Sequence, residues 1–438
     1  MQSRAATSVS LLAFLLALTF GISMNAQKDS LQTNVPKLPL PSGPFGVGRV
    51  GFDWIDPNRV GDMAEDRGAH SELMVYIWYP TEATGKEVKG TLFPGAKQID
   101  SAPDFSAYLK AKLFGGNWPL VVSGEIISHA LENAPITKHP KIFPVILFSP
   151  GANGTSFQYS SAIEDLVSHG YVVAAIEHTS EVFGVEFSDG KIHIYSATRI
   201  PQQSVPQPGA TKEEYEAKLE AWYRHCVDVR AADESFVLDK LIELNKAADG
   251  SQFSQRLDLA HVAAVGHSRG GWSSIVACRR DGRIKACVNE EGNAGGQGLD
   301  YPGAPTPKQP VMYVEISPVL KPGTTQNDWI VLKQLNLTAE QWVQQWHETV
   351  NKEFNAFPAG GYFVQLTVPG LEHYSFSDEV FLRAAQDGAK EKQEMALHDL
   401  RLTEDITRAF LDEVLKKQRQ TTLRDNSEMT VKHFGPGN

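Results

Sequence analysis

Short runs of apolar residues recur along the chain, and segments with helical periodicity separate them. Most of the runs are unbroken, which is typical of strands that are covered on both faces of a parallel sheet. The expected strands span residues 143–149, 171–177, 262–265, 284–288, 311–316 and 362–368, preceded by a loosely alternating run over 72–79. The expected helices span residues 155–168, 211–247, 270–280 and 338–355, with two more between 377 and 418. This alternation predicts an α/β fold, a doubly wound and mostly parallel sheet with helices on both faces.

Local signals at element ends support this pattern. Thr211 with Glu214, and Thr338 with Gln341, have the spacing of capping boxes, in which two side chains satisfy free backbone N–H groups at a helix start. Residues 185–194 instead predict a β-hairpin, because two short apolar runs flank an Asp-Gly turn. No internal repeat interrupts the alternation.

Length alone would allow several domains, but α/β folds with insertions reach this size as one. We therefore predict a single domain over residues 43–418, preceded by a linker over 27–42. Its insertions fall near residues 95–137, 183–210 and 318–358. The polar segment 419–438 is expected to be a frayed tail.

Residues 1–26 have the three parts of a secretory signal peptide. Arg4 gives a positive start, residues 9–22 form an apolar run, and small residues offer cleavage sites near Ala26. The run is shorter than the roughly 20 residues that a spanning helix needs, so an uncleaved anchor is the weaker alternative. We expect an exported protein, periplasmic or extracellular, with no transmembrane segment in the mature chain.

Charge and cysteine content narrow the possible partners. The chain has 41 basic and 52 acidic side chains and a net charge of −11, which argues against nucleic acid or an anionic membrane surface as electrostatic partners. Cys226, Cys278 and Cys287 lack the spacing of a metal site and are expected to be buried thiols. A Cys278–Cys287 bridge is the alternative, since one residue follows the strand 262–265 on a helix and the other lies on the next strand.

The clearest chemical signal is the segment Val262–Gly271, which reads V-A-A-V-G-H-S-R-G-G. A G-x-S-x-G motif between a strand and a helix is typical of a nucleophile elbow. Gly266 and Gly270 would let strand and helix pack closely while the sharp turn strains the serine backbone. We therefore predict that Ser268 is a nucleophile near the N-terminus of a helix.

A serine nucleophile needs a histidine base, and in α/β-hydrolases this histidine comes last in the chain order Ser, acid, His. Four histidines follow the elbow. His347 and His398 lie within expected helices and His433 lies in the tail, whereas His373 follows the strand 362–368 in a loop. Loops at the carboxyl edge of the sheet are where this fold places its chemistry, so His373 is the predicted base.

The acid that orients this histidine has several candidates. Glu290 and Glu291 follow the strand 284–288, and Glu315 lies near the end of a later strand. Asp300 lies in a glycine-rich loop and is less suitable. Position along the chain does not separate the three glutamates.

An oxyanion hole requires two backbone N–H groups that point at the developing negative charge. The amide of Arg269, directly after the nucleophile, is one candidate donor. The loop 150–154, which reads P-G-A-N-G, is expected to supply the other, because its glycines permit close backbone approach. An ordinary strand-to-helix turn is the alternative for this loop.

These motifs together resemble the platelet-activating factor acetylhydrolase family, of the plasma, lipoprotein-associated type with its bacterial relatives, in the α/β-hydrolase superfamily. The similarity runs from Gly43 nearly to Leu415. Its motifs are Gly43–Gly48, Trp78–Pro80, Phe148–Gly151, Ser168–His178, Gly266–Gly271 and His373–Asp378.

The resemblance implies a calcium-independent carboxylic ester hydrolase that needs no cofactor and removes short or oxidised sn-2 acyl groups from phospholipids. It places the acid at Glu291, 23 residues after Ser268, with Glu290 as the alternative. It places the oxyanion donors at Ala152 and Arg269. Two other functions are carried as alternatives: a broader carboxylesterase or polyester hydrolase, and a non-catalytic binding protein on the same scaffold.

The chain departs from the family pattern at three positions. Glu291 stands where the family has Asp, Pro150 replaces a histidine, and Arg269 replaces an apolar residue. The longer acid requires a different local backbone, and the arginine bears on substrate choice more than on mechanism. His178 and His267 belong to the family motifs and are predicted to be structural.

A helical apolar stripe lies upstream of the elbow. It consists of Phe105, Tyr108, Leu109 and Leu113, followed by Phe114, Trp118 and Leu120. The resembled family contacts lipid interfaces through an equivalent region, which implies a peripheral contact with lipid here. A helix that faces the core gives the same pattern and is the alternative.

Overall fold

The structure is a computed structural model. It describes residues 35–61, 70–82, 88–179, 181–194, 211–247, 250–292, 307–316 and 360–434, together with a few single positions between 338 and 348. The capping boxes predicted at Thr211 and Thr338 are both formed. The predicted signal peptide, Asp300 and His347 lie outside the described residues.

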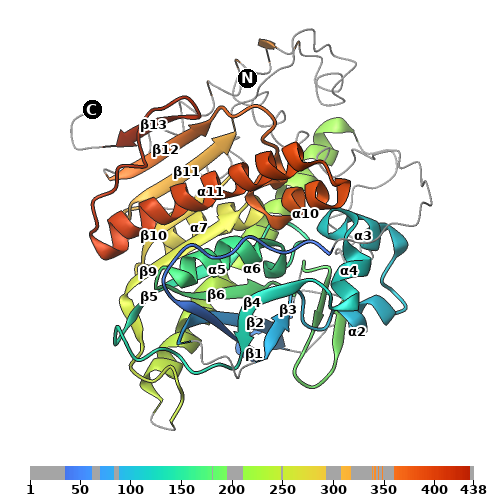
Figure 1. The fold of residues 1–438 in the computed structure, drawn as a ribbon, viewed down its shortest axis with the longest axis vertical. Helices are drawn as coiled ribbons and strands as arrows, with labels where there is room; N and C mark the ends of the chain where they lie inside the picture. Colours follow the sequence, from blue (N-terminus) through green and yellow to red (C-terminus); the bar gives the residue numbers. More distant parts are fainter. Residues whose placement is uncertain are drawn as a thin grey trace.

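One large sheet of eleven strands runs through the molecule (Figure 1). Its order is β13-β12-β11-β10-β9-β5-β6-β2-β1-β4-β3. Neighbouring strands from β12 to β6 in this order run parallel, whereas β6–β2, β2–β1 and β12–β13 are antiparallel. The strands are β1 Gly46–Val60, β2 His70–Thr81, β3 Lys89–Thr91, β4 Ile127–Glu132, β5 Phe143–Ser149, β6 Val172–Glu177, β9 Leu257–His267, β10 Ile284–Glu290, β11 Val311–Ile316, β12 Gly361–Leu366 and β13 Met429–Phe434. The strands expected from the apolar runs are all present in this sheet.

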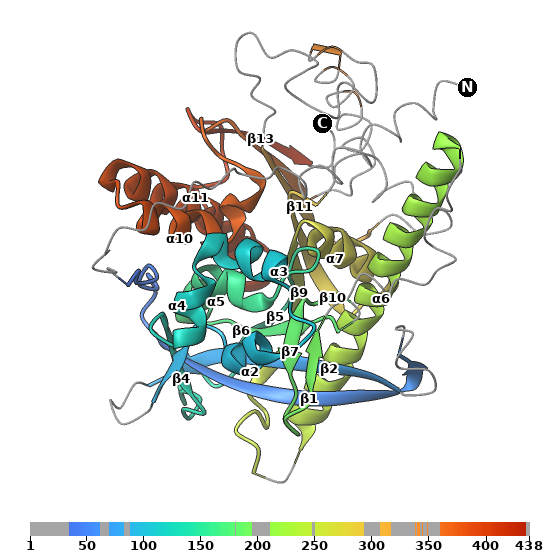
Figure 2. The same cartoon turned by 90° about the vertical axis from the view of Figure 1, so that its right-hand side faces the viewer.

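Helices cover both faces of the sheet (Figure 2). On one face lie α5 Ser160–Ser168, α10 Asp378–Asp387 and α11 Lys390–Lys416, and on the other lie α6 Lys212–Lys246 and α7 Arg269–Arg280. The strand β5 shows why: Ile146 and Phe148 join the apolar core beneath α5 and α11, while Val145 and Leu147 join the core beneath α6 and α7. A strand whose alternate side chains are buried on opposite faces reads as an unbroken apolar run, so the doubly wound fold is confirmed.

Three sequence expectations need correction, and the first concerns the C-terminal segment. Instead of fraying after Lys417, the chain forms β13, which pairs with β12 at the edge of the sheet. Met429 is buried there against the core. The open backbone groups of β12 offer partners that the polar composition of the segment did not reveal. The predicted hairpin, in contrast, is present as β7 Gly184–Glu186 and β8 Ile192–Ile194.

The second concerns the apolar stripe upstream of the elbow, most of which is buried in the core, as the alternative interpretation expected. After α2 Ala96–Ser101, the stripe is divided among α3 Ala107–Lys112, η2 Leu113–Gly116 and α4 Trp118–Ser123, with Phe105 just before α3. Phe105, Leu113, Phe114 and Trp118 are buried, and the Trp118 indole donates to Asp100 at 2.8 Å. Only Leu109 and Leu120 of the stripe are half-buried among its described side chains.

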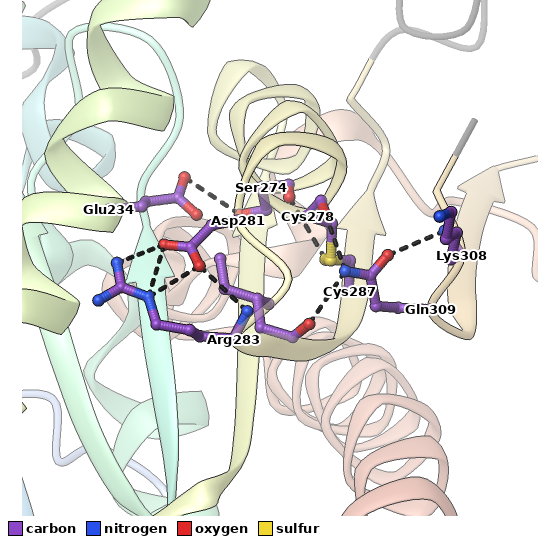
Figure 3. The surroundings of a disulfide bond; sticks show 9 residues. Glu234, Ser274, Cys278, Asp281, Arg283, Cys287, Lys308 and Gln309 are labelled. Carbon is purple, nitrogen blue, oxygen red and sulfur yellow. Dashed lines mark hydrogen bonds and ion pairs between the residues drawn. A yellow bond between two sulfur atoms is a disulfide. The ribbon is translucent and has the colours of Figure 1, made fainter. Parts of the chain in front are cut away.

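The expectation of three buried thiols is also wrong. Cys278 on α7 and Cys287 on β10 form a disulfide, with 6.4 Å between their Cα atoms (Figure 3). Cys226 is buried and takes no part in this disulfide. Two further contacts lie near the disulfide: Gln309 donates to the Cys278 carbonyl at 2.9 Å, and Arg283 forms an ion pair with Asp281. The bridge therefore ties the helix after the elbow to the strand that ends at Glu290.

No helix in the described parts of the chain is both long enough and apolar enough to cross a bilayer.

Candidate active site

The predicted nucleophile lies at a sharp turn between β9 and α7. Ser268 has φ 56° and ψ −125°, a conformation that residues with a side chain rarely adopt. Its amide donates to the Glu290 carbonyl at 2.8 Å, and the serine is 3% exposed. The Oγ atom therefore sits at the N-terminus of α7, where the helix dipole favours negative charge.

The glycines of the motif are required by contact distances. A Cβ on Gly266 would lie 2.4 Å from the Gly270 backbone, and a Cβ on Gly270 would lie 1.9 Å from the Ser149 carbonyl. Neither position can accept a side chain without moving β9, β5 or α7 apart. This close packing is what the G-x-S-x-G pattern predicted.

Ser268, His373 and Glu291 form a chain of hydrogen bonds in which the imidazole lies between the other two side chains. His373 begins the one-turn helix η6 His373–Phe376, after β12, and its Nε2 lies 3.0 Å from Ser268 Oγ. Its Nδ1 lies 2.5 Å from Glu291 Oε2. A carboxylate can only accept, so Nδ1 carries the proton and Nε2 is left to accept the serine hydroxyl.

The structure separates the candidate acids. Glu291 has φ 49°, and from this backbone the longer side chain reaches the imidazole. Glu290 points elsewhere: it is buried, accepts from Thr407 at 2.6 Å, and burial raises its pKa to about 7. Glu315 is buried on β11. The geometry thus favours Glu291 over the adjacent glutamate.

The loop after β5 lies directly beside the nucleophile. A Cβ built on Gly151 would be 3.5 Å from Ser268 Cβ, and a turn closes where the Gly154 amide donates to the Gly151 carbonyl at 3.0 Å. Ala152 is partly exposed in this turn. Arg269 is the first residue of α7, so its amide has no acceptor within the helix. Both predicted donors therefore flank the serine.

His267 packs beside the His373 imidazole, as predicted. Its ring centroid is 4.5 Å from that of His373, and burial lowers the pKa of His267 well below its usual value. The Tyr159 hydroxyl accepts from the Gly151 amide at 3.1 Å and lies 2.8 Å from His267 Nδ1, to which it donates. His267 is thus a neutral ring that connects the loop after β5 to the imidazole.

A buried polar layer lies behind the elbow, and few features of the sequence predict it. His178 bridges Ser149 Oγ and Asp233 Oδ2, each at 2.8 Å, which is the structural role predicted for it. Arg230 and Glu181 pair with each other in the same layer. The one feature of the sequence that could have indicated this layer is Arg269, because an arginine directly after the nucleophile is expected to be buried and then requires a carboxylate partner.

The described ranges contain one group that brings three potential metal ligands together: His267, Glu291 and His373, with ligand atoms within 4.8 Å of one another. Glu291 and His373 already hydrogen-bond to each other. A metal ion here would displace the contact that orients the imidazole. The arrangement suits proton transfer between the serine hydroxyl and the imidazole.

A serine on a strand-to-helix turn, with a histidine and a carboxylate from the ends of later parallel strands, defines the α/β-hydrolase fold. A solved ferulic acid esterase from Streptomyces cinnamoneus shares this fold, with a TM-score of 0.62 at 22% identity over 89% of this chain and 96% of that chain.

Sequence comparison places the chain within this class. The sequence model of platelet-activating factor acetylhydrolase, isoform II, matches residues 30–293. A probable 1-alkyl-2-acetylglycerophosphocholine esterase of Arthroderma benhamiae is 26% identical over 80% of this chain and 79% of its own length. The platelet-activating factor acetylhydrolase of Cavia porcellus is 26% identical over 57% of this chain and 54% of its own length. The chain belongs to the platelet-activating factor acetylhydrolase isoform II family and is an ester hydrolase.

Proposed function

We propose that this protein is a serine hydrolase that cleaves short or oxidised sn-2 acyl esters of phospholipids through an acyl-enzyme. The observation that carries the proposal is the imidazole of His373, which contacts Ser268 on one side and Glu291 on the other. The substrate class is supported by the names of the relatives, which include an alkylacetylglycerophosphocholine esterase.

The first half of the reaction follows from the hydrogen bonds. His373 Nε2 takes the proton of Ser268 as Oγ attacks the ester carbonyl, and Glu291 stabilises the imidazolium that forms. The imidazolium then protonates the leaving alcohol, the bond from carbonyl carbon to alkoxy oxygen breaks, and the acyl group stays on Oγ. A water molecule, deprotonated by the same Nε2, releases the acid and restores the serine.

The amides of Ala152 and Arg269 are proposed to hold the oxyanion. Both flank Ser268, and the Arg269 amide adds the positive end of α7. Loss of one such donor raises the barrier by about 3 kcal/mol.

Two further features belong to the proposal. Residues 1–26 would direct export, and the disulfide fits an oxidising compartment. Peripheral contact with a lipid surface would involve the half-buried Leu109 and Leu120, since Trp118 is committed to the core.

Relative rates on three esters test the substrate class. We expect kcat/KM for 1-alkyl-2-acetylglycerophosphocholine to exceed that for the 2-palmitoyl analogue by on the order of 100-fold, because a pocket for a short acyl group excludes a long one. Turnover of p-nitrophenyl acetate with both phospholipids left intact would instead identify a broader carboxylesterase or polyester hydrolase. Absence of turnover and of fluorophosphonate labelling would identify a non-catalytic binding protein.

A further inference from the structure

A buried ion-pair cluster lies behind the two proposed oxyanion donors. It consists of Glu181, after β6, Arg230 on α6 and Arg269 at the start of α7, and we call it the Glu181 bridge. The three residues are 2%, 0% and 7% exposed. One oxygen of Glu181 accepts from Arg230 Nε, and the other accepts from Arg269 Nη1. A single carboxylate therefore links two arginines from different helices.

The rest of the Arg230 guanidinium holds the loop after β5. Its Nη1 donates to the Pro150 carbonyl at 2.6 Å, and its Nη2 donates to the Gly151 carbonyl at 3.3 Å. The planar guanidinium presents these donors in a fixed fork, so both carbonyls are drawn toward the buried side of the loop.

Peptide geometry converts this contact into an orientation of the Ala152 amide. In a trans peptide, the C=O of one residue and the N–H of the next point in opposite directions. The Gly151 carbonyl points inward to Arg230, so the N–H of Ala152 points outward, to the side from which substrate would approach Ser268. The preceding peptide is held at both ends, because its C=O accepts from Arg230 and its N–H donates to the Tyr159 hydroxyl.

The second donor is tied to the same carboxylate. Arg269 supplies the other proposed oxyanion amide from its backbone, while its side chain pairs with Glu181 and lies 4.6 Å from the Tyr223 ring centroid. Glu181 thus contacts the side chain of one donor residue and, through Arg230, the loop of the other. The arginine that departs from the family pattern at 269 acquires a role in this arrangement.

We infer that Glu181 and Arg230 are positioning residues that hold the Ala152 and Arg269 amides at the spacing an oxyanion requires. This inference rests on the proposed serine mechanism. The Glu181 bridge would then contribute to binding of the transition state. An amide turned away from the oxyanion weakens binding of the transition state and leaves binding of the ester substrate largely unchanged.

Variants that keep size but alter the contacts test this role. Arg230→Lys keeps the charge but loses the fork, and Glu181→Gln keeps the shape but loses the charge. For each we expect kcat on p-nitrophenyl acetate to fall on the order of 10- to 100-fold, less than for loss of a whole donor, with KM changed less than about threefold. The inhibition constant of a trifluoromethyl ketone, which binds as a tetrahedral oxyanion, should rise by a similar factor. Rates are expressed per site titrated with a fluorophosphonate.

A partly buried ion pair elsewhere provides the control. Arg408→Met removes the ion pair with Asp165 on the opposite face of the sheet and should lower the unfolding midpoint with kcat per titrated site unchanged. If Arg230→Lys and Glu181→Gln behave like this control, the cluster only stabilises the fold and the inference is wrong. If one of them does not fold, the other decides. An active Ser268→Ala protein would overturn the serine mechanism and this inference together. If Ser268→Ala is inactive but Arg230→Lys and Glu181→Gln keep the wild-type kcat, this inference alone is wrong.

Discussion

Two regions of the molecule are built from the same kinds of residue but in opposite environments. One, which we call the edge, consists of Ser268, His373 and Glu291 at the carboxyl ends of the parallel strands. The other is the buried polar layer behind it. At the edge, the His373 and Glu291 side chains are 25% and 19% exposed. Glu234 on α6 belongs to the layer because Ser273, which contacts Ser149, donates to it at 2.9 Å. In the layer, Arg230, Asp233 and Glu234 are 1% exposed or less. Water can solvate a charge that moves during a reaction at the edge, whereas each charge in the layer depends on fixed partners.

This difference separates what each region can contribute. Burial raises the pKa of Glu234 to about 8, so this carboxyl is largely protonated at neutral pH, whereas burial lowers the pKa of Arg269 to about 9 and leaves its guanidinium charged for the ion pair with Glu181. Removing one partner there leaves another group buried and unpaired, which typically costs about 3–5 kcal/mol. We therefore expect substitutions at the edge to alter rate alone, and substitutions in the layer to alter stability as well.

The largest expected effect distinguishes two adjacent glutamates, Glu291 at the edge and Glu290, which is buried beside Thr407 on α11. Glu291→Gln should lower kcat about 10,000-fold, because the amide favours the wrong imidazole tautomer, with little change in the unfolding midpoint. Glu290→Gln is the matched control: its side chain is buried against Thr407, so kcat should stay within a few-fold of the wild type. Steady-state rates per titrated site and thermal melts measure both. A collapse of kcat in the control with normal turnover in Glu291→Gln would reverse the assignment of the acid.

A smaller effect is expected from the disulfide, which joins the helix after Ser268 to the strand that ends at Glu290. Because Cys278 and Cys287 close a loop with a sequence separation of 9, reduction should lower the free energy of unfolding by about 2–3 kcal/mol. Urea unfolding with and without a phosphine reductant measures this change, and kcat at 25 °C should be unaffected. Cys226→Ser should show the same dependence on reductant. Identical unfolding curves in both conditions would show that the bond contributes nothing to stability.

The smallest effect is a pH dependence that originates in the layer. Burial raises the pKa of Glu234 to about 8, against contributions from Arg230 and from hydrogen bonds with Ser273 and Ser274 that lower it. Between the unfolded pKa near 4.3 and about 8, the folded state binds more protons than the unfolded state, so stability is lost as pH rises. Between pH 5 and 8, the free energy of unfolding of Glu234→Gln should fall by up to about 1 kcal/mol less per pH unit than that of the wild type, as measured by urea unfolding. Parallel slopes for the two proteins would show that Glu234 does not titrate in this window.

The residues that meet at the edge could largely be predicted from the sequence, because the elbow and the chain order are visible in local patterns. Gly266 and Gly270 are required by backbone contact, and His373 follows from chain order and its place after β12. The choice of Glu291 over Glu290 needed the family spacing, since adjacent residues on a strand end point to opposite sides and sequence does not show which faces the imidazole.

For the layer, the arginine at 269 is the one such signal, and it does not identify its partners. Glu181 and Arg230 are 49 residues apart and come from a turn and a helix, so only the three-dimensional structure brings them together. The same holds for β13, whose polar sequence pairs only because β12 offers an open edge. In both cases the structure depends on contacts between residues that are far apart in the chain, and local sequence patterns do not show such contacts.

The most direct test of the proposed chemistry is covalent labelling with a fluorophosphonate, followed by peptide mapping of the adduct. We predict a single adduct on Ser268 and a loss of ester hydrolysis in proportion to the labelled fraction, with no adduct in His373→Ala on the same timescale. Full turnover by completely labelled protein, or a label on a different residue, would contradict the account.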